Sequence, residues 1–325
     1  MTEIRIDPLS GRRAIISTDS QPTRPAVEPQ QPIDAAHDPF AEGHEVRAGP
    51  ELHAVRPGGG APDTPGWIVR VLRGQVLRPE QPDLPPQDSP GLFAALPARG
   101  SHEIIVNAPQ AVVSLAELEL EQLQAAVEVW RERMRAHDGA AYVHLSVDER
   151  VAAGPRHTHA HLHALDFVPA TIARERERFS AHAVRTMGAN LLEDLVADEV
   201  RRRERIVAID DEAVLLCPYA SARPFQLMLA PRRPRERFQD DGPTGAALLH
   251  RGLRLLQARF GSSPPLSLWV RTAPRGADRF CWRIDVVPRL MDAGGLELGT
   301  GLAHNPVAPE RAAAELRVLS RPPAR

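Results

Sequence analysis

The sequence predicts an α+β fold with two similar halves, each a mostly antiparallel sheet with packed helices. The order strands, helix, strands occurs twice along the 325 residues, and this length is enough for two domains of ordinary size. The regular alternation of single strands and helices that is typical of a doubly wound parallel sheet is missing. We therefore expect an N-terminal half at residues 1–173 and a C-terminal half at residues 174–325.

In the first half, residues 21–97 are so rich in Pro, Gly and Asp that helix and sheet periodicity is broken. A helix is predicted from Ser114, which forms a Ser-x-x-Glu capping box with Glu117, to a stop near Gly139. A further strand is predicted at 141–147. Short segments typical of strands lie at residues 12–17, 67–72 and 102–107.

The second half begins with a helical stretch from about Thr171 to Arg205, in which Arg and Glu recur at i,i+4 spacing. We expect this stretch to link the two halves as one long, partly solvated helix. An amphipathic helix is predicted at 245–261. Segments with the pattern of strands surround it, at residues 205–219, 225–231, 267–274 and 280–290.

The charge balance argues against polyanionic partners that bind through the net charge of a protein. Forty basic and 42 acidic side chains leave a net charge of -2, so we expect binding to neither nucleic acid nor an anionic membrane. No run approaches the roughly 18 apolar residues of a membrane span. The polar N-terminus does not have the pattern of a signal peptide. These features predict a cytoplasmic protein that holds any anion in a local pocket.

Two residue types narrow the chemistry further. The chain has no lysine, so all 40 basic residues are arginine, which excludes a P-loop lysine and a Schiff-base lysine. The two cysteines, Cys217 and Cys281, cannot form a disulfide framework or a Cys-rich zinc cage by themselves. Both lie in apolar surroundings and are interpreted as buried small residues.

Four of the 13 histidines occur within seven residues, at alternate positions from His157 to His163. Alternation with small or apolar residues predicts a strand on which all four imidazoles share one face, roughly 6.5 to 7 Å apart. A neutral imidazole can attack phosphorus and form a nucleotidyl-imidazole, while flanking rings stabilise the phosphoryl oxygens. Gly154, just before this segment, offers a close backbone approach for a phosphate.

Two other interpretations of the histidine segment remain open. Alternating imidazoles can converge on one zinc ion, so the segment could be a metal site. It could also be a solvated or structural stripe without chemistry.

Around this segment the sequence resembles the galactose-1-phosphate uridylyltransferase family, the transferase branch of the histidine-triad superfamily. The branch pattern is His-Pro-His-x-Gln, and the matching stretch here runs from His157 to His161 with His159 in the second histidine position. The likeness extends over nearly the whole chain. The similar segments are residues 5–17, 23–25, 38–45, 95–106, 114–118, 164–175, 271–290 and 297–317.

The resemblance implies two histidine-triad-like halves and a nucleotidyltransferase. In this hypothesis a nucleoside monophosphate, most simply UMP, moves between a nucleotide sugar and a hexose 1-phosphate through a nucleotidyl-His159 intermediate. His157 and His161 complete the expected catalytic set. Because His161 stands where the transferase branch has Gln, a nucleotide hydrolase or phosphorylase is the alternative. A non-catalytic nucleotide- or metal-binding protein is a second alternative, and the resemblance also implies a homodimer.

Further substrate contacts follow from the same resemblance. Arg24 matches an arginine that contacts phosphate, and Asn305 matches a residue on the sugar side of the pocket. Asp148 lies near the place of an asparagine, where its charge would suit a ribose hydroxyl or an arginine better than a phosphate. His163 and Gly154 complete the expected substrate-binding set, whereas His102 is interpreted as a structural residue at a strand edge.

No metal is expected. Of the structural zinc ligands of many family members, only His157 is present, because the other positions hold Asp38, Ala41 and Ala111. The second metal site of some members uses histidines where this chain carries Arg271, Arg283 and Asp285. The sequence therefore predicts that the structural zinc is absent and that no cofactor is required for the chemistry.

Overall fold

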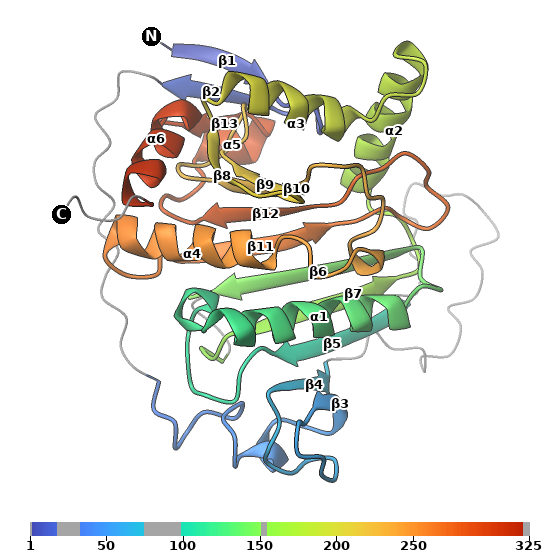
Figure 1. The fold of residues 1–325 in the computed structure, drawn as a ribbon, viewed down its shortest axis with the longest axis vertical. Helices are drawn as coiled ribbons and strands as arrows, with labels where there is room; N and C mark the ends of the chain where they lie inside the picture. The colour runs from blue at the N-terminus through green and yellow to red at the C-terminus, as the bar shows by residue number, and fades with distance from the viewer. Residues whose placement is uncertain (1, 18–32, 75–98, 151–154, 321–325) are drawn as a thin grey trace.

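A computed structural model describes residues 2–17, 33–74, 99–150 and 155–320 (Figure 1). Its main element is one ten-stranded sheet in which every hydrogen-bonded pair of strands is antiparallel. The α+β class predicted from the sequence is confirmed. In spatial order the strands are β3 (Glu51–Val55), β4 (Val69–Arg73), β5 (Gly100–Val106), β7 (His159–Leu165), β6 (Tyr142–Glu149), β11 (Leu266–Arg271), β12 (Arg283–Pro288), β10 (Leu227–Pro231), β9 (Ala213–Leu216) and β8 (Ile206–Ile209).

The two expected sheets are joined edge to edge through β6 and β11, where Leu266 is opposite Glu149 and Trp269 is opposite Ser146. This pairing satisfies backbone groups that would otherwise be exposed along two sheet edges. A separate three-stranded sheet has the order β1 (Thr2–Ile6), β2 (Arg13–Ser17) and β13 (Ala303–Asn305), so that β2 pairs antiparallel with β1 and parallel with β13.

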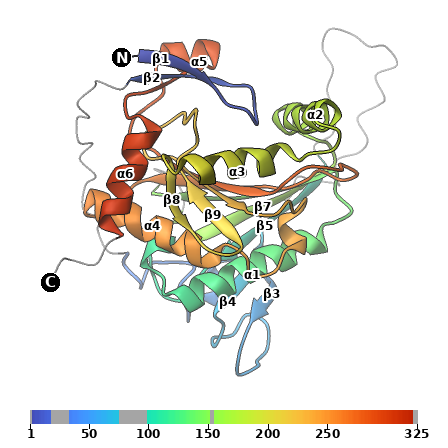
Figure 2. The same cartoon turned by 45° about the horizontal axis from the view of Figure 1, so that its top comes forward.

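Helices pack against both faces of the large sheet (Figure 1, Figure 2). The α-helices are α1 (Leu120–Ala136), α2 (Ala170–Arg185), α3 (Leu191–Arg202), α4 (Ala246–Phe260), α5 (Gly295–Thr300) and α6 (Pro309–Leu319). Three short 3-10 helices are η1 (Glu45–Arg47), η2 (Leu115–Glu117) and η3 (Phe238–Asp240). Figure 1 shows α1 and α4 on the same face of the sheet. Helix α3 lies on the opposite side in Figure 2.

The main core lies between α1, α4 and the inward-facing residues of both halves of the sheet. In α1, the residues Leu123, Ala126, Val127, Trp130 and Met134 are buried at helical spacing. They pack in one cluster with residues of β6 and β7 such as Leu145 and Leu162.

On the other face, a smaller apolar cluster joins α2 and α3 to β8, β9 and β10, and contains no residue of β5, β6 or β7. On β6 and β7, the alternate residues His144, Ser146, Asp148, His159, His161 and His163 lie on the face opposite α1, and His102 of β5 is in register with His163 there.

Two predicted helices differ from the structure. Ser114 caps only the short helix η2, since its Oγ accepts from the Ala116 N–H and donates to Oε2 of Glu149, and α1 begins later, at Leu120. The stretch predicted as one helix from Thr171 to Arg205 is two helices. Gly188 adopts φ 119° between them, a conformation open to glycine, and Asn190 caps α3.

The other predicted strands are present, although their ends differ by a few residues. The exception is residues 205–219, which form two paired strands, β8 and β9, and not one. The predicted boundary between residues 173 and 174 lies inside α2, and the division into halves stays a prediction. Within the described ranges, no helix has the length and apolar character that crossing a bilayer requires.

Candidate active site

The histidine segment forms β7, an internal strand between β5 and β6. His159, His161 and His163 alternate with the buried residues Ala160 and Leu162, which pack in the main core. The three imidazoles therefore share the face opposite α1, as the alternation predicts. In register with them on the neighbouring strands, His163 lies opposite both His102 and His144, and His161 lies opposite Ser146.

His157 departs from this arrangement because it precedes the strand, so that the expected shared face of four imidazoles is shown for three of them. Strand β7 begins only at His159, because Thr158 hydrogen-bonds through its backbone with Val112 and Asn107 instead of with a strand of the site. The His157 residue is 1% exposed. Its Nδ1 lies 2.7 Å from Oδ2 of Asp38 and its Nε2 lies 2.8 Å from the carbonyl oxygen of Ala108.

His159 has the geometry of a nucleophile. Its Nδ1 lies 2.6 Å from the carbonyl oxygen of His157. A carbonyl only accepts hydrogen bonds, so Nδ1 carries the proton and Nε2 carries the lone pair. Burial lowers the pKa of His159 and outweighs the hydrogen bond to His157, which raises it. The ring is thus held neutral, and Phe40 packs edge-on against it at 5.1 Å between centroids.

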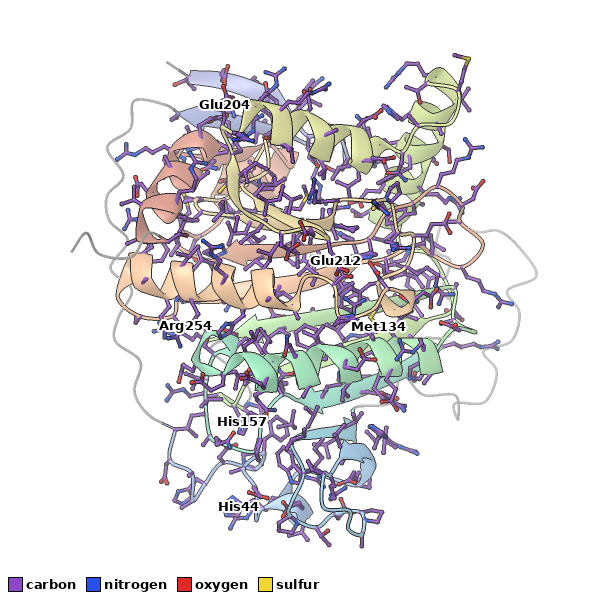
Figure 3. All side chains as sticks on the ribbon, in the orientation of Figure 1. His44, Met134, His157, Glu204, Glu212 and Arg254 are labelled. Atoms are coloured by element: carbon purple, nitrogen blue, oxygen red, sulfur yellow. The ribbon has the colours of Figure 1, made fainter. Side chains whose placement is uncertain are left out.

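His157 supports His159 through its main chain and not through its imidazole ring. It is the main-chain carbonyl of His157 that accepts from His159, while the His157 side chain anchors this main-chain segment to Asp38 and Ala108. Figure 3 labels His157 and His44 toward the β3–β4 end of the molecule, and both rings contact Asp38. The tautomer of His159 is therefore set by buried backbone.

His161 and His163 form a cluster with His102 of β5. Nε2 of His102 lies 2.9 Å from Nδ1 of His161. The rings of His102 and His163 stack with centroids 4.3 Å apart and planes 4° apart. Strand β5 is internal, so the interpretation of His102 as a strand-edge residue is wrong. No short-range sequence pattern links His102 to β7, since 59 residues separate it from His161.

Burial, together with the neighbouring histidines, lowers the pKa of His161 to about 4, and burial lowers the pKa of His144 to about 4. Between pH 6.5 and 4 the unfolded chain therefore binds more protons than the folded protein. We expect the contribution of these two histidines to make the free energy of unfolding fall as the pH falls through this window. Denaturant titrations should show a smaller fall for His161→Gln, and an unchanged fall for His37→Gln at an exposed position. An equal fall in all three proteins would contradict the low pKa of His161.

Asp148 faces an arginine, one of the two environments that suit its charge. Its Oδ1 accepts from the Ser267 hydroxyl and, at 3.1 Å, from Arg289. It lies on β6, two residues beyond Ser146, on the polar face of the sheet.

Asn305 is another expected substrate contact. Asn305 is in the small sheet, where its Nδ2 donates to the carbonyl oxygens of Ser221 and Arg223 and its Oδ1 accepts from the Val307 N–H. These bonds give the amide a structural use in a turn. Arg24 and Gly154 lie outside the described residues, so their expected phosphate contacts stay predictions.

The residues at the expected zinc position do not fit that ion. Asp38 and His157 bond directly to each other, the second ring nitrogen of His157 donates to a carbonyl, and Ala41 offers no ligand atom. Burial alone would raise the pKa of Asp38, but hydrogen bonds from His157 and the Phe40 N–H outweigh it and lower the pKa. A buried ion pair thus occupies the place where zinc ligands would be needed.

The second expected metal position also holds ion pairs. Arg283 is 3.1 Å from Glu175 of α2 and 3.2 Å from Asp285, and Arg271 lies 3.8 Å from each of these carboxylates. Two guanidinium groups cannot ligate a cation. Across the described part of the chain, no group of three or more His, Cys, Asp or Glu is arranged to hold a metal ion.

Both cysteines are buried, and burial raises the pKa of each thiol, to about 12 for Cys281. Neither is a thiolate near neutral pH, which agrees with the interpretation as packing residues.

The fold and the site together define a class of protein, an α+β protein with an internal strand that presents a neutral histidine. Residues 75–169 match the family model described as galactose-1-phosphate uridyl transferase, N-terminal domain. The chain is 24% identical to ADP-glucose phosphorylase of Arabidopsis thaliana over 98% of its own length and 93% of the relative. It is 26% identical to galactose-1-phosphate uridylyltransferase of Rattus norvegicus over 97% and 87%. Over nearly its whole length the chain is therefore similar to galactose-1-phosphate uridylyltransferases and to an ADP-glucose phosphorylase.

Solved structures support the fold. A protein from Arabidopsis thaliana described as GalT-like superposes with a TM-score of 0.77 at 22% identity, covering 97% of this chain and 98% of that chain. An ADP-glucose phosphorylase from the same organism, determined with bound ADP-glucose, gives a TM-score of 0.76 at 21% identity, covering 98% and 99%.

Proposed function

We propose that this chain is a nucleotidyltransferase that moves a nucleoside monophosphate from a nucleotide sugar to a phosphate acceptor through a nucleotidyl-His159 intermediate. UMP as the transferred group and a hexose 1-phosphate as the acceptor are the simplest choice. The observation that carries the proposal is the hydrogen bond from Nδ1 of His159 to the carbonyl of His157, because it leaves Nε2 as a nucleophile.

In the first step, Nε2 of His159 attacks the α-phosphorus. A P–N bond forms, the P–O bond to the sugar 1-phosphate breaks, and that product leaves with the bonding electron pair. The ring is then cationic because Nδ1 keeps its proton, and the His157 carbonyl, 2.6 Å away, stabilises this charge. In the second step, a phosphate oxygen of the acceptor attacks phosphorus, the P–N bond breaks and Nε2 regains its lone pair.

A phosphorylase is the second candidate, with orthophosphate as the acceptor. His161 favours it, and the family includes a relative named ADP-glucose phosphorylase that matches 98% of this chain. Water as the acceptor would make the protein a hydrolase. The three acceptors share the first step and differ only in the second.

The acceptor can be identified by comparing how fast different acceptors remove the label from the enzyme. The enzyme is first incubated with a nucleotide sugar labelled at the α-phosphorus, with UDP-glucose and ADP-glucose as the donors to compare. The labelled protein is then given hexose 1-phosphate, orthophosphate or buffer alone. We expect rapid loss of label with one of the two phosphates and slow loss in buffer. Equal loss in all three conditions would contradict a transferase and support the hydrolase.

The remaining expectations form part of the proposal. Substrate contacts at Arg24, Asp148, Gly154, His163 and Asn305, a homodimer, a cytoplasmic location and activity without zinc are all proposed from the family resemblance and from the residues present. A nucleotide sugar and a sugar 1-phosphate are the proposed partners, and neither nucleic acid nor a membrane is proposed as one.

A further inference from the structure

His102 is held in a fixed position beside the proposed catalytic strand. Its Nε2 bonds Nδ1 of His161 at 2.9 Å, and its ring stacks on His163. The Gly74 N–H donates to the His102 carbonyl, and a Cβ atom at Gly74 would lie 2.2 Å from Nδ1 of the His102 ring. Close packing on two sides thus limits how this imidazole can turn.

A single hydrogen atom lies between the two bonded ring nitrogens when both rings are neutral, and it can belong to either. If Nδ1 of His161 donates, then Nε2 of His161 has only a lone pair to offer. If Nε2 of His102 donates, then Nδ1 of His161 accepts and Nε2 of His161 carries a hydrogen. The state of His102 therefore decides whether His161 presents a donor or an acceptor.

Phosphoryl oxygens accept hydrogen bonds, so only the second arrangement suits a phosphate on His159. The His161 ring lies next to the His159 ring, with centroids 4.8 Å apart and planes at 79°. We infer that His102 is a positioning residue, whose Nε2–H donates to Nδ1 of His161 and so keeps the Nε2–H of His161 available to the phosphoryl group on His159. This inference rests on the proposed function.

A double-mutant cycle tests the inference. The measured quantity is the rate of nucleotidyl-enzyme formation in a single turnover, with the labelled nucleotide sugar that labels the wild type. His102→Phe keeps an aromatic ring for stacking but has no hydrogen-bond donor. We expect it to slow labelling by roughly 10- to 100-fold, because the developing oxyanion then loses a hydrogen-bond donor. His102→Gln keeps an amide donor, and we expect it to restore most of the rate.

The second arm of the cycle uses His161→Gln. A glutamine amide carries its own N–H groups and does not depend on a neighbour to set a tautomer. We therefore expect His102→Phe to have little further effect in the His161→Gln background. His53→Phe, on strand β3 of the same sheet, is the matched control for replacing a partly buried histidine with phenylalanine and should label at the wild-type rate.

The possible failures are distinguishable. If the wild type never acquires label, the proposed function fails. If the wild type is labelled but His102→Phe labels equally fast, or slows labelling equally in both backgrounds, the role of His102 is contradicted. Nitrogen-15 spectra of the imidazoles give a second test that needs no activity. They should show Nδ1 of His161 without hydrogen in the wild type, and a protonated Nδ1 there would overturn the inference.

Discussion

Replacing His159 with alanine is expected to lower kcat/KM by about 10⁴-fold or more, because the reaction loses the atom that bonds to phosphorus. The residue is 7% exposed, and its Nδ1 hydrogen-bonds to a main-chain carbonyl of the same segment. Its removal therefore leaves the Asp38–His157 pair and the His102–His161 pair in place. Steady-state kinetics with the most active nucleotide sugar would measure the effect.

The control for this substitution is His37→Ala, which removes a histidine whose side chain is 86% exposed. Both variants should unfold cooperatively, and His37→Ala should have wild-type kcat/KM. Retention of a large fraction of activity by His159→Ala would show that another group attacks the substrate, or that water attacks it directly.

Replacing Asp38 with alanine is expected to lower the free energy of unfolding by about 3 to 5 kcal/mol, because one partner of a buried ion pair is left without its counterpart. The side chains of Asp38 and His157 are 2% and 0% exposed, and the bond between them is 2.7 Å long. The pair also anchors the carbonyl that accepts from His159. Denaturant titrations at neutral pH would measure the loss of stability.

The chain contains a matched control for this substitution. Asp34 and His37 form an Asp–His pair of the same length, 2.7 Å, but their side chains are 67% and 86% exposed. Asp34→Ala should therefore leave the unfolding transition unchanged.

If the buried pair stabilises this segment without zinc, purified wild-type protein should contain no stoichiometric zinc, and a chelator should leave its Tm unchanged. One tightly bound zinc per chain, or equal effects of the two alanine substitutions, would contradict this account.

Much of the fold follows from local patterns. The repeated order of strands and helices predicts the α+β class, and the alternation in the histidine segment predicts which face of β7 carries His159, His161 and His163. The join between β6 and β11 has no local signal, because an edge strand and an internal strand have the same alternation. The break between α2 and α3 depends on the left-handed conformation of Gly188, in a stretch whose charge pattern is otherwise helical.

The site is harder to predict for a physical reason. The alternation of histidines begins at His157, two residues before the strand, so the pattern alone cannot show that the His157 ring is buried against Asp38. Its partner Asp38 is 119 residues away in sequence, and His102 reaches β7 only through the pairing of β5. Contacts of this kind depend on the register of strands, which periodicity within one strand does not specify.

The central claim is that Nε2 of His159 bonds covalently to the α-phosphorus. The most direct test is to quench the wild-type enzyme with its nucleotide sugar under alkaline conditions, digest it and locate the modified residue by mass spectrometry. The account predicts one nucleoside monophosphate per chain, attached to the peptide that contains His159 and absent from His159→Gln. An adduct on another residue, or turnover of substrate with no adduct at any time, would contradict it.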